Sequence, residues 1–93
     1  MLDEKIKQNA VAVMEHAVGL DRKKPYKRHG KLFYRPYRNY FATGAKNDLW
    51  EAIRNEGYAT AQQQQSSVYY FLTRSGLDWL GVQIGVHIYD ESD

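Results

Sequence analysis

The stretch LWEAIRNEGYATAQQQQSSVYYFLTRSGLDWLG, residues 49–81, indicates the fold class of this chain. Its first third has apolar residues at helical spacing and then a glycine, which predicts a helix at about 48–56 that ends at Gly57. Asp48 and Glu51 stand at the start of this helix with the spacing of a capping box. The side chains of the helix expected to face the core are Leu49, Trp50 and Ile53.

The second part of the same stretch predicts a hairpin and another helix. Residues typical of β-strands flank the polar turn QQQSS, which indicates two antiparallel strands at about 58–73. Thr73 is placed to cap a final helix at about 74–84. The face of the second strand expected to pack on the core carries Val68, Tyr70 and Leu72.

The N-terminal part of the chain adds a long helix. Apolar residues recur every three or four positions, so we expect a helix at about 4–20. Asp3 is a suitable N-cap, and Gly19 can end the helix in a left-handed conformation. The predicted core stripe of this helix consists of Ile6, Ala10, Val13, Ala17 and Leu20.

The remaining segments are shorter. Residues 25–35 contain the turn signal RHGK, in which Gly30 can take a positive φ, and then the β-forming KLFYR, so they predict a hairpin. Pro36 stops regular pairing, and residues 36–44 are predicted to form a turn or a short helical piece. The tail, residues 86–93, is expected to add at most a short strand and to be frayed.

The order of the elements in residues 49–81 resembles the C-terminal half of winged-helix domains of bacterial transcription regulators. There, a helix ends in a glycine, a wing hairpin follows, and an LT-x-x-G stretch opens the next helix, as LWEAIRNEGYA and VYYFLTRSGLDWLG do here. We therefore expect residues 1–93 to form a single winged-helix-like α+β domain.

A longer set of motifs, HAVGL, PYRNYFATG, WEAIRNEGYA and YYFLTRSGLDWLG, lies between residues 16 and 81. This set is similar to a family of small uncharacterised phage and prophage proteins. The resemblance implies a phage or prophage accessory protein and no particular mechanism. The hairpin YKRHGKLFYR departs from the shorter members of that family, so no function of their equivalent loop is carried over.

Composition argues against several classes of protein. The chain has no cysteine, so it has no disulfide framework and no thiol chemistry. It begins MLDEKIKQN, which is too polar for a secretory signal, and no apolar run is long enough to span a membrane. We therefore expect a protein of the host cytoplasm that does not contact a membrane.

Positive charge is concentrated in one segment of a chain whose formal net charge is only +2. Residues 22–46, the basic segment, hold nine Lys or Arg and no acid, whereas the remainder holds four basic and eleven acidic residues. Such an asymmetry indicates a surface for an acidic partner. The residues expected to bind nucleic acid are Arg22, Lys23, Lys24, Lys27, Arg28, Lys31, Arg35, Arg38 and Lys46. The residues expected to stack on bases or to contact a partner are Tyr26, Tyr34 and Tyr37.

Structural roles for the basic segment stay open. Basic residues on an exposed hairpin also serve simply to protect an edge strand and keep it soluble. Arg38 can instead brace a helix C-terminus or pair with an acid, while Asn39 caps a turn. Ion pairs from the basic segment to Glu51, Glu56 or Asp78 would weaken the nucleic-acid hypothesis.

A conventional operator-binding repressor is not favoured. In a DNA-reading winged helix, the helix before the wing enters the major groove and basic side chains at the wing tip hold phosphates. Here the helix at 48–56 has a net charge of −2 and the tip QQQSS has no cation. The sequence therefore predicts binding of little or no sequence specificity through the basic segment, to duplex or single-stranded nucleic acid.

Enzyme chemistry and cofactor binding are not expected. The three histidines, His16, His29 and His87, are far apart in sequence and form no metal-ligand motif. No glycine-rich phosphate loop and no Ser-His-Asp arrangement is evident. We therefore predict no catalytic residue, no metal and no cofactor.

The alternative function is a protein–protein interaction module that uses the same scaffold without contacting DNA. Enrichment in aromatic residues and arginine is also typical of protein interfaces. The expected partner is then a host or phage protein, and the opposed charges of the two parts of the chain also permit a homo-oligomer. Salt-sensitive binding to a polynucleotide separates the two functions, because an interaction module need not show it.

Overall fold

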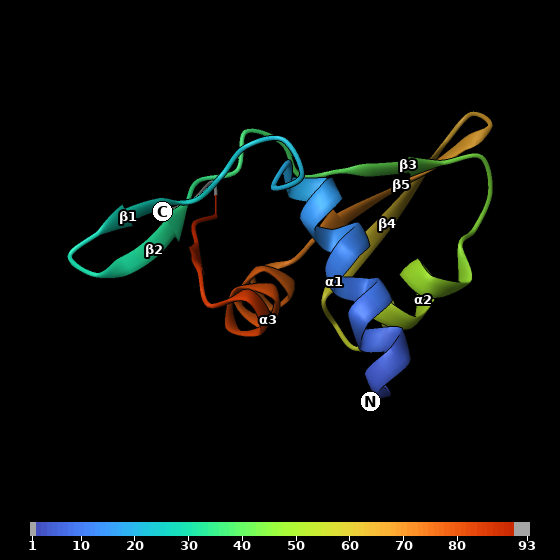
Figure 1. Ribbon diagram of the computed structural model, residues 1–93. Helices are drawn as coiled ribbons and strands as arrows, with labels where there is room; N and C mark the ends of the chain where they lie inside the picture. The colour runs from blue at the N-terminus through green and yellow to red at the C-terminus, as the bar shows by residue number, and fades with distance from the viewer. Residues whose placement is uncertain (1, 91–93) are drawn as a thin grey trace.

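Three helices and two small sheets make up the described part of the chain, residues 2–90 of a computed structural model (Figure 1). The elements are α1 (Glu4–Val18), β1 (Tyr26–Arg28), β2 (Lys31–Tyr34), β3 (Phe41–Thr43), α2 (Asp48–Asn55), β4 (Ala59–Gln64), β5 (Ser67–Leu72), α3 (Arg74–Ile84) and β6 (His87–Ile88). The predicted α+β class and the three predicted helices are confirmed. No helix in residues 2–90 is long and apolar enough to cross a bilayer.

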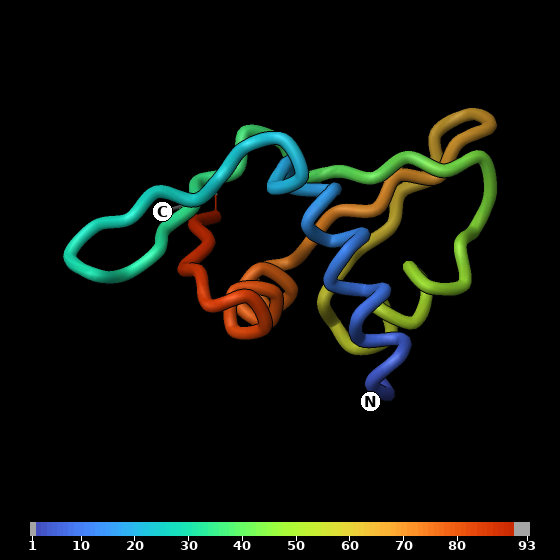
Figure 2. Tube along the Cα trace, viewed as in Figure 1, coloured from blue at the N-terminus to red at the C-terminus, as the bar shows by residue number. Residues whose placement is uncertain are grey.

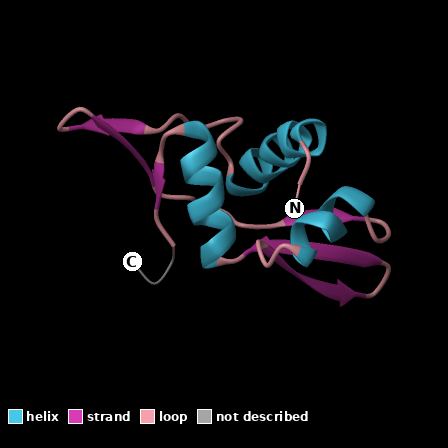
Figure 3. Ribbon diagram, turned by 90° about the horizontal axis from the view of Figure 1, so that it is seen from below, coloured by secondary structure: helices cyan, strands magenta, loops and turns pink. Residues whose placement is uncertain are grey.

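The two sheets lie toward opposite ends of the molecule, with α3 between them (Figures 1 and 3). One has the strand order β1-β2-β6 and the other β3-β5-β4. Both predicted hairpins are present, since β1 pairs antiparallel with β2 and β4 pairs antiparallel with β5. The last strand, β6, joins β2 in parallel, so the end of the chain returns to the first hairpin.

Helix α1 begins and ends through the capping interactions that the sequence predicts. The Asp3 carboxylate accepts a hydrogen bond from the Ile6 amide over 2.9 Å. Gly19 has a φ of +86° and is the C-cap, so the helix is slightly shorter than predicted. A Cβ atom at Gly19 would lie 2.3 Å from Cε1 of Tyr37, which means that the tyrosine ring packs directly over the helix end.

The core side of α1 is rotated slightly from the predicted stripe. Ala10 and Ala17 are fully buried as expected, but Ile6 is 37% exposed. Met14 and Val18, which were not in the predicted stripe, are fully buried instead. The difference arises because tertiary packing, and not the apolar spacing alone, selects which side of a helix faces the core.

The predicted N-cap of α3 is confirmed, whereas the predicted N-cap of α2 is wrong. Thr73 caps α3, since its hydroxyl accepts a hydrogen bond from the Gly76 amide over 3.0 Å. Helix α2 is capped by Asn47, not by the predicted capping box of Asp48 and Glu51. The Glu51 carboxylate instead accepts a 2.7 Å hydrogen bond from the Tyr70 hydroxyl, a partner that only the tertiary structure supplies.

Residues 36–44 do not form the predicted turn or helical piece. They contain β3, which pairs antiparallel with β5 and places Phe41 opposite Tyr70. The Asn39 side chain extends this pairing, since its amide donates to the Leu72 carbonyl (3.0 Å) and accepts from the Leu72 N–H (2.8 Å). Asn39 is therefore a backbone mimic in the sheet and not a turn cap.

The tail is better packed than expected. Residues 87–88 form β6, and Val86 and Ile88 are buried. The Tyr89 N–H donates to the Tyr34 carbonyl over 2.9 Å, which continues the pairing beyond the strand. The predicted fraying is thus wrong for residues 86–89, and residues 91–93 lie outside the described part of the chain.

One hydrophobic cluster joins the helices to both sheets. Trp50 of α2 stacks on Tyr70 of β5 at 5.3 Å between ring centroids, and Phe41 packs against the same indole. The predicted core face of β5 is confirmed, because Val68, Tyr70 and Leu72 are buried. The opposite face of β5 is only half-buried.

Candidate nucleic-acid interface

The β1–β2 hairpin extends away from the helices into solvent, and the molecule is elongated, with extents of 44 × 28 × 22 Å (Figure 2). Its two-residue tip, His29 and Gly30, has positive φ at both positions, which matches the twist of the flanking strands. Lys27, Arg28 and Lys31 are exposed beside this tip. None of the ion pairs found among residues 2–90 includes these three cations.

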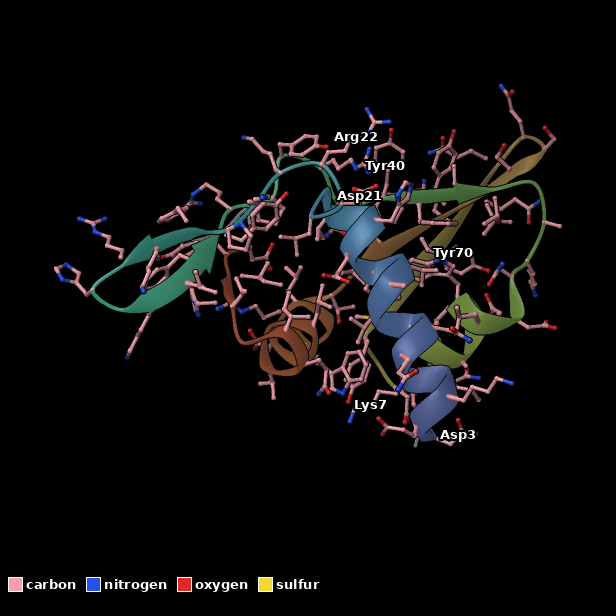
Figure 4. All side chains as sticks on the ribbon, in the orientation of Figure 1. Asp3, Lys7, Asp21, Arg22, Tyr40 and Tyr70 are labelled. Carbon is pink, nitrogen blue, oxygen red and sulfur yellow. The ribbon has the colours of Figure 1, made fainter. Side chains whose placement is uncertain are left out.

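The connection from α1 to the hairpin continues the positive charge. Arg22, Lys23 and Lys24 are all exposed in this connection. Figure 4 places Arg22 near Tyr40 at the C-terminal end of α1, while Asp3 and Lys7 lie at the other end of that helix. We call the exposed cations that follow the chain from α1 to the hairpin tip the basic strip. Its members are Arg22, Lys23, Lys24, Lys27, Arg28 and Lys31.

Arg38 does not belong to this exposed strip. Its Nη2 atom donates to the His16 carbonyl at 2.6 Å and lies 3.4 Å from Oδ1 of Asp21. The same aspartate binds the His16 ring at 2.6 Å. Arg38 thus braces the C-terminal end of α1 and pairs with an acid, as the structural alternative predicted, and its assignment to the binding surface is corrected.

The carboxylate in this cluster is held ionised by its neighbours. Desolvation acts to raise the pKa of Asp21. The hydrogen bond from His16 and the charges of His16 and Arg38 outweigh desolvation, and the pKa of Asp21 lies below its usual value. The negative charge of Asp21 therefore stays next to Arg38 and cancels part of the positive potential at the start of the basic segment.

We expect Arg38→Ala to lower the free energy of unfolding by about 1.5–3 kcal/mol, because charge-assisted hydrogen bonds of a partly buried group are lost. Arg22→Ala, which removes an exposed arginine close to the same helix end, is the matched control and should change stability by no more than about 0.5 kcal/mol. Urea denaturation followed by circular dichroism measures both. Equal effects of the two substitutions would contradict the bracing role.

The last two predicted cations lie in different settings. Arg35 is at the base of the hairpin, with its guanidinium carbon 4.6 Å from the Tyr89 ring centroid. Lys46 is exposed in the connection between β3 and α2, on the opposite side of the molecule from the hairpin (Figure 1). Its charge contributes, after the Tyr70 hydrogen bond and Arg54, to lowering the pKa of Glu51 against desolvation. Lys46 is therefore separate from the basic strip.

Of the three predicted stacking residues, two are about half exposed and one is buried. Tyr34 is only 2% exposed and its hydroxyl donates to the Val18 carbonyl over 2.7 Å, so it is a core residue and not a stacking platform. Tyr37 is 51% exposed, but its ring covers the end of α1 and has Lys23 and Arg38 within 5.6 Å of its centroid. Tyr26 is 47% exposed on the edge strand β1.

The structure brings two aromatic residues of the tail, His87 and Tyr89, to the hairpin, where they were not predicted. Phe33 of β2 stacks on Tyr26 at 6.0 Å and on Tyr89 at 6.1 Å between ring centroids. His87 of β6 contacts both Phe33 (5.9 Å) and Tyr89 (4.7 Å) edge to face. His87 and Tyr89 were missed because only the long-range pairing of β6 with β2 brings them to the hairpin. The sequence signal that could have found them is the alternation of apolar Val86 and Ile88 with His87 and Tyr89, which is typical of a strand with one buried face.

Two of the three acids that could have neutralised the basic segment form ion pairs with cations outside it. Glu51 pairs with Arg54 at 3.2 Å and Asp78 with Arg74 at 3.4 Å. Within residues 2–90, no three His, Asp or Glu side chains converge in a way that could hold a metal ion. The surface of the hairpin presents positive charge and exposed aromatic rings.

Comparison with known proteins adds no relative to these observations. No protein-family model, no curated protein sequence and no solved structure matches this chain.

Proposed function

We propose that this chain is a non-enzymatic protein that binds nucleic acid through the basic strip, with little or no sequence specificity. Phosphate groups are the natural partners of a row of exposed lysine and arginine side chains. The hairpin carries the strip away from the body of the protein, where a long polyanion can lie along it without contacting the helices.

One observation carries this proposal. Arg28 and Lys31 are paired directly across the hairpin, and no acid among residues 2–90 forms an ion pair with either of them. Like charges directly opposite each other destabilise a sheet. The need to keep an edge strand soluble does not require both members of a cross-strand pair to be cations, whereas two adjacent cations favour the binding of a phosphate.

The proposal is tested by fluorescence anisotropy with labelled duplex and single-stranded DNA at several salt concentrations. If about six cations contact phosphates, the association constant should fall roughly 10³-fold between 50 and 200 mM salt. In the variant Lys27→Glu/Arg28→Glu/Lys31→Glu, binding should be lost at moderate salt, and any residual salt slope should be smaller by about three.

The control variant carries the same change of charge at other places. Lys5, Lys7 and Arg74 lie on α1 and α3, outside the basic strip. The variant Lys5→Glu/Lys7→Glu/Arg74→Glu should therefore weaken binding only by making the overall electrostatic potential of the protein more negative. Equal losses in both triple variants, or no binding by the parent chain at low salt, would overturn the proposal.

We also infer a winged-helix-like scaffold for residues 47–84. The succession of α2, the β4–β5 hairpin and α3 capped by Thr73 supports it. Helix α2 is acidic and the β4–β5 tip is uncharged, so the scaffold presents the β1–β2 hairpin to nucleic acid instead of a helix. The phage or prophage role and the cytoplasmic location implied by the sequence resemblance stay predictions.

A second candidate function is favoured by a groove of about 640 Å³ between the hairpin and α3. Two exposed apolar side chains line it, Leu32 (40% exposed) and Val82 (78% exposed). Such side chains around a groove are typical of protein interfaces. An interaction module of this kind need not bind polynucleotide, so the titration above separates the two functions.

A further inference from the structure

The outer face of the β1-β2-β6 sheet carries a row of aromatic side chains. Tyr26 is paired with Phe33, and Phe33 with His87, in the strand register. Residues paired across strands point to the same face of a sheet. The three rings therefore lie side by side, and Tyr89, two residues beyond His87, joins them through stacking on Phe33.

This face is not the core face of the sheet. Tyr34 and Ile88, which alternate with the aromatic residues, are each 2% exposed and belong to the hydrophobic cluster. On the aromatic face, Tyr26 is 47% exposed and His87 is also exposed. At the base of the sheet, the side of Tyr34 and Ile88 is packed on the protein. Nearer the tip, Lys27 and Leu32 of that same side are exposed, and the side with the rings is turned to solvent along the hairpin.

Cations lie on the same face at both ends of the aromatic row. Arg28 and Lys31 form the next pair toward the hairpin tip, two residues from Tyr26 and Phe33, and so share their face. At the base, the Arg35 guanidinium lies over the Tyr89 ring. Aromatic rings flanked by cations are the combination that proteins use to stack bases while they hold the backbone of a single strand.

We propose that this face binds single-stranded nucleic acid, with bases stacked on the aromatic row that starts at Tyr26 and phosphates held by Arg28 and Lys31. The inference rests on the proposed function and makes it more specific. Bases in a duplex are covered by their neighbours, whereas unstacked bases of a single strand can reach a ring. The chain therefore prefers single strands, and its duplex binding uses the cations alone.

The test compares a labelled oligothymidylate with a duplex of the same length. Tyr26→Ala should weaken single-strand binding by roughly 5- to 150-fold, the range for one stacked base, and leave duplex binding unchanged. The matched control is Tyr40→Ala. Tyr40 is 48% exposed and contacts Tyr69 beside the other sheet, where the row is absent. Thermal melts confirm that both variants are folded.

A second variant keeps the test decisive if Tyr26→Ala loosens the hairpin. Tyr26→Trp retains an aromatic ring, so it should keep single-strand affinity, and its added fluorescence should be quenched when a base stacks on it. Tyr40→Trp should show no such quenching.

The outcomes separate the two proposals. Unchanged single-strand affinity in Tyr26→Ala and no quenching in Tyr26→Trp would overturn the stacking surface. In that case, loss of binding in Lys27→Glu/Arg28→Glu/Lys31→Glu would still support the basic strip. Equal affinity of the parent chain for both strand forms would also contradict the preference for single strands, whereas no binding to either form would remove both proposals.

Discussion

Gly76→Ala is expected to destabilise this protein by about 1–3 kcal/mol or more, although alanine is the better helix former. Gly76 lies in the first turn of α3. A Cβ atom there would be 2.0 Å from the carbonyl oxygen of Tyr58 and 2.9 Å from its carbonyl carbon. Helix propensity alone would predict a gain of up to about 1 kcal/mol, so the sign of the effect tests the packing.

The obstructing group cannot easily move aside. The Tyr58 carbonyl is backbone, and it accepts the Thr73 N–H over 3.0 Å at the point where β5 passes into α3. A shift of this carbonyl would break that hydrogen bond and disturb the cap of α3, because Thr73 is its N-cap. Gly76→Ala thus disturbs both the packing of α3 against the Tyr58 carbonyl and the N-terminal cap of α3.

Chemical denaturation measures the effect as a shift of the midpoint at constant slope. The control is Gly44→Ala, since a Cβ atom at Gly44 has no other atom within 4 Å. That variant should be as stable as the parent chain or slightly more stable. A Gly76→Ala protein at least as stable as the parent chain would show that α3 does not pack so closely on Tyr58.

Trp50→Ala is expected to cost about 3–5 kcal/mol, the usual range for deletion of a large buried aromatic side chain. Trp50 is fully buried and lies between Phe41 and Tyr70. Its loss would leave a cavity where α2 meets the β3-β5-β4 sheet. Because domains of this size are stable by about 5–15 kcal/mol, the variant should have lost much of its stability.

Two further substitutions identify the cause. The indole Nε1 of Trp50 is buried and has no hydrogen-bond partner among residues 2–90. Trp50→Phe keeps most of the packing and removes this unpaired donor, so it should cost less than about 2 kcal/mol. Trp79→Ala removes a half-buried indole stacked on Tyr58 and should also cost less than Trp50→Ala. Equal losses for Trp79→Ala and Trp50→Ala would contradict the central position of Trp50.

The features that the sequence predicted correctly are those with local causes. Asp3 and Thr73 cap helices by bonding to an amide three residues ahead. Gly30 takes positive φ in the first hairpin as predicted, and its conformation depends on the turn itself. The exposure of the hairpin cations also follows from local properties, because an isolated cation is too costly to bury.

The features that were missed depend on residues far apart in the chain. Strand β3 has only three residues and exists through its pairing with β5. The sequence left the role of Arg38 open between binding and bracing, and Arg38 braces α1 because that helix ends beside it. Tyr34 was missed as a core residue, whose hydroxyl donates a hydrogen bond to the distant Val18 carbonyl. No local pattern distinguishes these two side chains from the exposed Arg22 and Tyr26.

The candidate site shows the same division. The sequence by itself determined where positive charge is concentrated, because charge belongs to the residues wherever they lie. Only the tertiary structure decided which aromatic rings stand beside that charge, because β6 pairs with β2 across more than fifty residues and brings His87 and Tyr89 next to Phe33. The register between two strands decides which side chains are neighbours across a sheet. The spacing of residues along one strand does not predict that register when the partner strand is far away in the sequence.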